Sequence, residues 1–158
     1  MNFGIGDEER HEINQQMNEV LSNLAVLTQK VRNYHWNMKG DRFIMFHELL
    51  EDMYDDYADY QDDIAERVTT LGGKAIGTLD GFKKHSNLQE VQGNQSENDM
   101  IRTLANDHEK MSRHIRDSIQ QLEDRDDVAG ADLLTEILNE IETNDWKLRS
   151  HIDKDVQK

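Results

Sequence analysis

Cysteine and proline are both absent from this chain of 158 residues. Without cysteine, a disulfide framework and a zinc site with thiolate ligands are excluded. The lack of thiols also suits a protein that meets peroxide, because thiols are readily oxidised. The absence of proline, together with only 35% hydrophobic residues, suits a chain made mostly of helices with charged outer faces.

Long apolar runs are missing as well. No segment approaches the length that spans a membrane, and the first residues, MNFGIGDEERHE, have neither the basic region nor the apolar core of a signal peptide. We therefore expect a cytoplasmic protein with no membrane partner. The length predicts a single domain over residues 1–158, with residues 1–7 as a short extension that has no basic tail.

Basic residues are scarce. The chain has 33 acidic and 18 basic residues, a formal net charge of −15, and no basic cluster at either end. Binding to DNA depends chiefly on Lys and Arg side chains that displace counterions from phosphates. We therefore expect no direct binding to DNA.

Apolar residues recur at steps of three and four through most of the chain, which predicts helices. The expected helices cover residues 8–38, 41–71, 97–123 and 127–156. Gly40 should end the first helix as a left-handed cap, and Asp41 should cap the second. Gly72 and Gly73 should stop the second helix. The fold class is therefore all-α.

The connection between the second and third helices, residues 74–96, is long and rich in Gly, Ser, Asn and Gln. Residues 79–88 within it have some helical character. A crossover of this length lets the second and third helices run parallel. We expect the ferritin-like version of the four-helix bundle.

Histidines and carboxylates form one strip of the second helix. If His47 is set at zero on a helix that advances roughly 100° per residue, Glu51, Asp62 and Glu66 all fall within roughly the next 100°. His35 lies on the apolar stripe of the first helix. Imidazole and carboxylate are ligands that iron and zinc accept, so the strip is a candidate metal site. The alternative is a solvated face, because 32% of the residues are charged.

The strip is too long for one ion. His47 and Asp62 lie roughly 22 Å apart along the axis at 1.5 Å per residue, whereas ligands of one ion lie about 2.0–2.2 Å from the metal. If two copies of the second helix lie antiparallel about a twofold axis, the histidine end of one meets the carboxylate end of the other. The geometry predicts two shared sites in each dimer. A dimer interface with charges at its edges is the alternative.

The order of residues in this region resembles the signature of the Dps family, the mini-ferritins of starved or oxidatively stressed bacteria. The motif reads Y-H-W-N-x-K-G, then F-x-x-F-H-E, then D-x-x-x-E-R-x-x-x-L-G-G, in residues 34–40, 43–48 and 62–73. The segment W-x-L-R that begins at Trp146 resembles the ending of the family. In that family the crossover carries a short extra helix, which residues 79–88 would form.

The resemblance implies a cage of twelve identical subunits, built from twofold dimers, that oxidises ferrous iron and stores the ferric mineral. Its ferroxidase centres would be di-iron sites shared between subunits, with hydrogen peroxide preferred over dioxygen as the oxidant. Other divalent metals would substitute for iron. The ligands implied by the resemblance are His35, His47, Asp62 and Glu66, with Glu51 at a position where many members have Asp.

The resemblance implies further roles for residues around these ligands. Tyr34 and Trp36 are candidate electron donors, and packing at the helix end is the alternative for both. Acidic pores on the threefold axes would admit iron, because converging carboxylates attract cations. The pore candidates are Asp126, Asp127 and Asp132, and capping of the fourth helix is the alternative.

The other histidines are interpreted as packing residues rather than ligands. His108 lies on the apolar stripe of the third helix without an acidic partner at ligand spacing, and His11, His85, His114 and His151 are interpreted in the same way. No Glu-x-x-His pair occurs on the last three predicted helices, which argues against a di-iron site inside one bundle. Two functions remain open: the iron-storing ferroxidase, and a structural nucleoid-associated cage that protects DNA by binding it.

Overall fold

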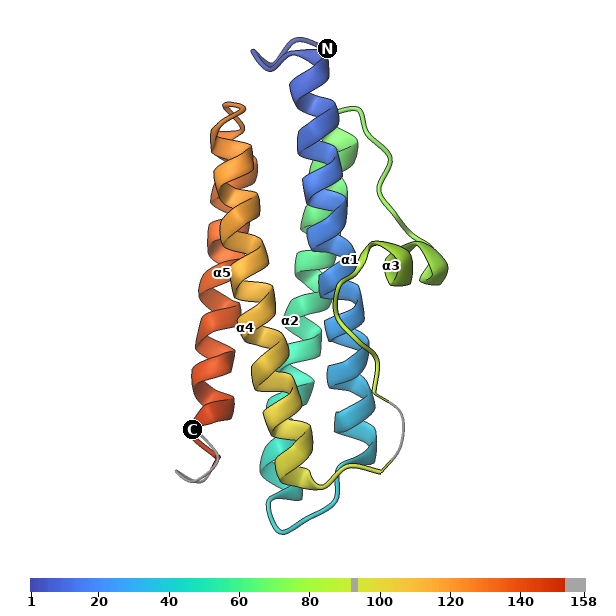
Figure 1. The fold of residues 1–158 in the computed structure, drawn as a ribbon, viewed down its shortest axis with the longest axis vertical. Helices are drawn as coiled ribbons and strands as arrows, with labels where there is room; N and C mark the ends of the chain where they lie inside the picture. The colour runs from blue at the N-terminus through green and yellow to red at the C-terminus, as the bar shows by residue number, and fades with distance from the viewer. Residues whose placement is uncertain (92–93, 153–158) are drawn as a thin grey trace.

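Five helices make up the fold (Figure 1), and the computed structural model describes residues 1–91 and 94–152. The helices are α1 (Asp7–Asn37), α2 (Phe43–Thr70), α3 (Leu79–His85), α4 (Glu97–Glu123) and α5 (Val128–Arg149). Within these described ranges there is no strand, so the predicted all-α fold is confirmed. None of the helices in these ranges is both long and apolar enough to cross a membrane.

The four long helices form the bundle that the sequence predicts. α1 lies against α2, α4 lies against α5, and α1 also contacts α4. The crossover carries the chain back along the outside of α1, so that α2 and α4 run in the same direction (Figure 1). The short helix α3 lies in this crossover and contacts α1. The extra helix and the parallel pair are therefore confirmed.

The predicted apolar stripes face one another in a single core. Leu24, Phe46, Tyr57, Ile101 and Ile141 are fully buried in it, one or two from each long helix. Burying a large apolar side chain contributes about 1.5–3 kcal/mol relative to leaving it exposed. The core fixes the faces of α1 and α2, and thereby the direction in which their polar residues point.

The glycine stop after α2 is confirmed. Gly72 has a φ of 81°, in the left-handed region that glycine enters at little cost. The Gly73 N–H donates to the Val68 carbonyl (N to O 2.9 Å), and the Gly72 N–H donates to the Thr69 carbonyl (2.9 Å). These two bonds form a Schellman motif, which satisfies carbonyls at the helix end and turns the chain into the crossover.

Both caps predicted between α1 and α2 are wrong. α1 ends at Asn37 with Met38 as its C-cap in an extended conformation, and Gly40 lies two residues further on with a φ of 152°. Arg42 takes the N-cap position of α2 in place of Asp41. Arg42 Nε donates to Glu97 Oε1 of α4 (2.6 Å), and Arg42 Nη1 donates to the His151 carbonyl (2.6 Å). These long-range bonds set the path of the linker, which local cap preferences do not predict.

Two predicted helix ends are also corrected. α3 ends at His85 rather than near residue 88, because Ser86 Oγ and the Asn87 N–H both donate to Asn23 Oδ1 of α1. α5 ends at Arg149, with Ser150 as its C-cap, rather than near residue 156. Residue 156 itself lies outside the described residues.

Candidate metal centre

His35 and His47 meet where α1 ends and α2 begins. Their imidazole rings stack with centroids 3.7 Å apart and planes 13° from parallel. His35 is 6% exposed and His47 is half-buried. The short linker between the helices therefore brings together two residues that the sequence predicts to act in one site.

Each histidine is held by the backbone of the other. His35 Nδ1 lies 2.7 Å from the His47 carbonyl oxygen, and His47 Nδ1 lies 2.9 Å from the His35 carbonyl oxygen. A carbonyl oxygen only accepts, so each Nδ1 carries a proton and donates it. In a neutral ring the lone pair then resides on Nε2, which is the form that binds a metal ion.

Two further side chains line the histidine pair. The ring of Tyr54 meets the ring of His35 edge to face, with centroids 5.2 Å apart. The Arg32 guanidinium carbon lies 5.0 Å from the centroid of the Tyr54 ring. Neither residue was predicted as part of the site. Helix spacing could have indicated both residues, because Tyr54 lies two turns after His47 and Arg32 lies one turn before His35, on the same helix faces.

The carboxylates of the strip are all exposed. Glu51 lies one turn after His47, whereas Asp62 and Glu66 lie near the opposite end of α2. Across residues 1–91 and 94–152, no three His, Asp or Glu side chains are grouped closely enough to hold a metal ion. One chain thus presents a histidine half at one end of α2 and a carboxylate half toward the other.

His108 is a core histidine, as the sequence predicts. Its Nδ1–H donates to the Leu104 carbonyl (N to O 2.7 Å), and the Tyr57 hydroxyl donates to its Nε2 (O to N 2.6 Å). Asn144 Nδ2 donates in turn to the Tyr57 hydroxyl oxygen (2.9 Å). Burial lowers the pKa of His108 because the charged ring would lose its hydration. This network is not predictable from helix periodicity, since its members come from three helices.

The two aromatic candidates beside His35 differ in their surroundings. Tyr34 is buried and its hydroxyl donates to Gln95 Oε1. Burial raises the pKa of Tyr34. Trp36 is 63% exposed on the surface of the chain. Tyr34 is therefore part of the core, and Trp36 is available to a partner subunit or to solvent.

The three pore candidates are placed in two different ways. Asp127 is 1% exposed, forms an ion pair with Arg67, and caps α5 by accepting from the Gly130 N–H (N to O 3.0 Å). Its carboxylate is engaged within the chain, as the capping alternative predicts. Asp126, with a φ of 61°, and Asp132 are both exposed. Arg67 of the Dps-like motif thus holds the start of α5, a role that the sequence did not suggest.

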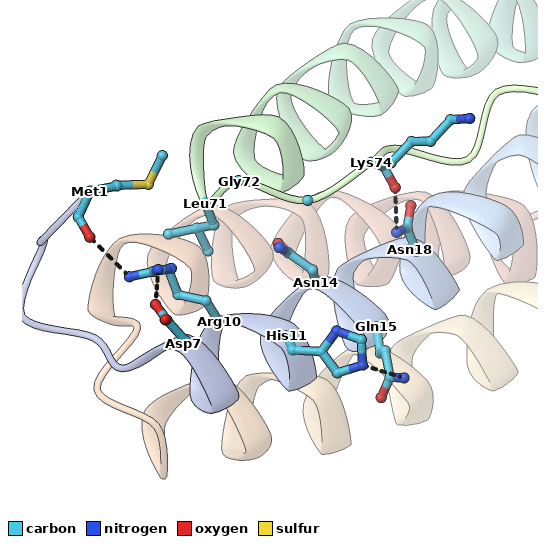
Figure 2. A pocket seen from close by; sticks show the side chains of 11 residues that line it. Met1, Asp7, Arg10, His11, Asn14, Gln15, Asn18, Leu71, Gly72 and Lys74 are labelled. Carbon is cyan, nitrogen blue, oxygen red and sulfur yellow. Dashed lines mark hydrogen bonds and ion pairs between the residues drawn. The ribbon is translucent and has the colours of Figure 1, made fainter.

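A separate pocket lies at the far end of α1 and α2 from the histidine pair (Figure 2). It is lined by residues such as His11, Asn14 and Gly72. Asp7 is paired with Arg10, and His11 shares a hydrogen bond with Gln15 (Nε2 to Nε2 3.3 Å). Because these polar groups are engaged with one another, the pocket does not compete with the histidine pair as a metal centre.

Comparison with known proteins identifies the family. The family model described as a ferritin-like domain matches residues 14–157. DNA protection during starvation protein 2 of Bacillus anthracis is 30% identical over 138 residues, which cover 87% of this chain and 94% of that protein. The chain belongs to the Dps family of ferritin-like proteins. The resemblance of the motif in residues 34–73 is thereby confirmed.

Two other proteins match over nearly the whole chain. A low temperature-induced protein of Nostoc sp. is 37% identical over 155 residues, covering 97% of this chain and 87% of that protein. The structure of DpsC from Streptomyces coelicolor superposes with a TM-score of 0.93 at 27% identity, covering 96% of this chain and 90% of that one. The four-helix bundle with a short crossover helix is thus the Dps fold.

Proposed function

We propose that this Dps-family chain is the subunit of a ferroxidase and iron-storage cage. The observation that carries the proposal is the stacked histidine pair, in which two reciprocal backbone bonds leave both Nε2 lone pairs free for a metal ion. Ferrous iron accepts mixed nitrogen and oxygen ligands, and the carboxylates of α2 supply the oxygens. Iron is the substrate, and other divalent metals would occupy the same ligands.

The complete centre is formed by two subunits. His35, His47 and Glu51 would come from one chain, and Asp62 and Glu66 from its twofold partner. The histidine and carboxylate halves of one α2 are separated by roughly 22 Å, so neither half can complete the other within a chain. Antiparallel pairing of two α2 helices completes two centres with one symmetry operation. We propose that such dimers assemble into a cage of twelve subunits in the cytoplasm.

The proposed reaction balances with two ferrous ions in each centre. Each ion gives one electron, and hydrogen peroxide takes both electrons and two protons to become two molecules of water. A paired site therefore reduces peroxide without releasing a hydroxyl radical. Dioxygen is the alternative oxidant. The backbone bonds of His35 and His47 keep the ligand nitrogens in place while the charge on iron changes.

An anaerobic ferrous titration followed by peroxide tests the proposal. We expect saturable iron binding, a rapid rise of ferric absorbance after peroxide, and iron that elutes with the assembled protein in sizing. The double variant His35→Ala with His47→Ala should lose the rapid phase. The control is the double variant His11→Ala with His85→Ala, which changes two exposed histidines and should keep the rapid phase. Equal rates in both variants would contradict the proposal.

Physical protection of DNA by binding is the second candidate. It is favoured by the name of the relatives in Bacillus anthracis and Brevibacillus brevis, both called DNA protection during starvation proteins. The net charge of −15 opposes direct contact with phosphates. Removal of iron and peroxide protects DNA without contact, so we propose the iron chemistry as the function.

A further inference from the structure

Three of the four tyrosines of the chain follow one another at steps of three residues on α2: Tyr54, Tyr57 and Tyr60. Residues three apart on a helix are neighbours, with Cβ atoms about 5–6 Å apart. Tyr54 touches the ring of His35, whereas Tyr57 is fully buried between α2, α4 and α5. Tyr54 thus lies beside the proposed iron centre, and Tyr57, three residues further along α2, lies in the interior of the bundle.

The hydroxyl of Tyr57 is in contact with a base, the imidazole of His108. The hydroxyl lies 2.6 Å from His108 Nε2, and His108 Nδ1–H is committed to the Leu104 carbonyl, so Nε2 holds the lone pair. Burial lowers the pKa of His108, which keeps the ring neutral and able to take a proton from a strong donor. Asn144 Nδ2 donates to the same phenol oxygen (2.9 Å).

The other tyrosines lack such an acceptor. Tyr34 donates to the amide oxygen of Gln95, which takes a proton far less readily than imidazole. In the part of the chain that the structure describes, the hydroxyl of Tyr54 has no hydrogen-bond partner. A tyrosine loses an electron more readily when its proton can move at the same time to a base in contact with it. This contrast singles out Tyr57.

We propose that Tyr57 is a redox-active residue that gives one electron to peroxide, by way of Tyr54, when a centre holds too little iron, and passes its proton to His108. The proposal rests on the proposed ferroxidase function and adds a role for residues that do not bind iron. Peroxide that receives a single electron releases a hydroxyl radical. The electron from Tyr57 would be the second one and would prevent that release.

One ferrous ion and Tyr57 each give one electron to hydrogen peroxide, which takes two protons from solvent and becomes two molecules of water. The O–H bond of Tyr57 breaks and an N–H bond forms at His108 Nε2, leaving a neutral phenoxyl radical beside an imidazolium. A ferrous ion that arrives later returns the electron, and the proton moves back from His108 to the Tyr57 oxygen.

Freeze-quench electron paramagnetic resonance tests the proposal on the assembled, full-length protein. The protein is loaded anaerobically with half the ferrous iron that saturates it and mixed with peroxide. We expect a tyrosyl radical whose phenoxyl oxygen couples to two exchangeable protons, from His108 and Asn144. Tyr57→Phe should lose this signal, and Tyr54→Phe should form it more slowly. The matched control Tyr34→Phe, in another buried tyrosine, should retain it.

Iron oxidation in the same samples separates the two proposals. Wild-type protein that oxidises iron without a tyrosyl radical, or Tyr57→Phe protein that keeps the wild-type signal, overturns the tyrosine relay alone. Wild-type protein that oxidises no iron at full loading overturns the proposed function and the relay with it. If Tyr57→Phe fails to assemble, His108→Gln takes its place, since glutamine accepts the hydrogen bond but is not a base. Retention of the signal in His108→Gln overturns the relay.

Discussion

Lys30 of α1 and Asp107 of α4 form an ion pair inside the bundle. Lys30 Nζ lies 2.5 Å from Asp107 Oδ2, and both side chains are at most 5% exposed. Taking two charges out of water is costly, and the cost is offset only while both partners are present. Removal of one partner leaves an uncompensated buried charge.

We predict that Asp107→Asn destabilises the protein by about 3–5 kcal/mol, the usual cost of breaking a buried pair. Urea unfolding at one protein concentration measures the change. Glu90→Gln is the matched control, because the Lys83 and Glu90 pair is exposed, with Nζ and Oε2 3.9 Å apart. It should change stability by less than about 1 kcal/mol. Equal losses in the two variants would be inconsistent with the burial argument.

Stability should fall below about pH 6.5, the ordinary pKa of histidine. Burial lowers the pKa of His108 and also that of His114, so the unfolded chain takes up protons that the folded chain resists. The unfolded state therefore binds more protons, and stability present above the unfolded pKa is lost as pH decreases through this range.

Urea midpoints between about pH 8 and pH 5 check this dependence. His108→Gln should lower stability at high pH but flatten the decline toward low pH. His85→Gln, in an exposed histidine, should reproduce the wild-type profile. A decline of the same steepness in His108→Gln would assign the pH dependence to other groups.

Helix α2 carries both halves of the proposed centre, and its length separates them. A variant without His35 and His47 and a variant without Asp62 and Glu66 should each lose rapid ferroxidase activity. Removal of groups that only orient metal ligands typically lowers activity by about 10–100-fold. Removal of the ligands themselves should lower the ferroxidase rate by more. Co-assembly should recover part of the activity, because each mixed dimer contains one intact centre and one doubly defective centre.

Stopped-flow oxidation of ferrous iron measures this recovery in verified mixed oligomers. Random pairing makes about half of the dimers mixed, so about a quarter of the wild-type centres return. Each variant must assemble alone, as judged by sizing. Mixed oligomers that recover nothing would rule out the shared centre.

Two carboxylates are the proposed entry point for iron in the whole assembly: Asp126, between α4 and α5, and Asp132, near the start of α5. Asp126 and Asp132 are exposed, and we predict that replacing both with Asn slows iron uptake, because three converging copies would no longer attract cations. Asp127→Asn should instead lower thermal stability, since it weakens the pair with Arg67 and the cap of α5. Stopped-flow uptake and thermal melting separate the two effects. Unchanged uptake in the double variant would reject the pore assignment.

The surface as a whole should repel DNA. With a net charge of −15, the protein should form no complex with a linear duplex in a gel-shift assay at neutral pH and low salt. Chelator must be present, because divalent cations can bridge acidic protein to phosphate. Tight binding under these conditions would overturn the argument from composition and favour the nucleoid-associated alternative.

The helices and the strip of candidate ligands are properties of the local sequence. Spacing of three and four residues decides which side chains share a face, so α2, its glycine stop and the shared face of His47, Glu51, Asp62 and Glu66 are predictable before any tertiary contact is known. The same regularity excludes a single ion bound at both ends of the strip. The family motif adds the expectation of iron.

Contacts between helices decided the rest, because the partner of a side chain depends on how distant segments pack. Arg42 binds Glu97 and displaces the predicted cap, and Asp127 binds Arg67 rather than facing outward. The reciprocal backbone bonds of His35 and His47 depend on how the end of α1 packs against the start of α2. Periodicity places each residue on its own helix, but only the packed bundle brings the side chain of Tyr57 on α2 to that of His108 on α4.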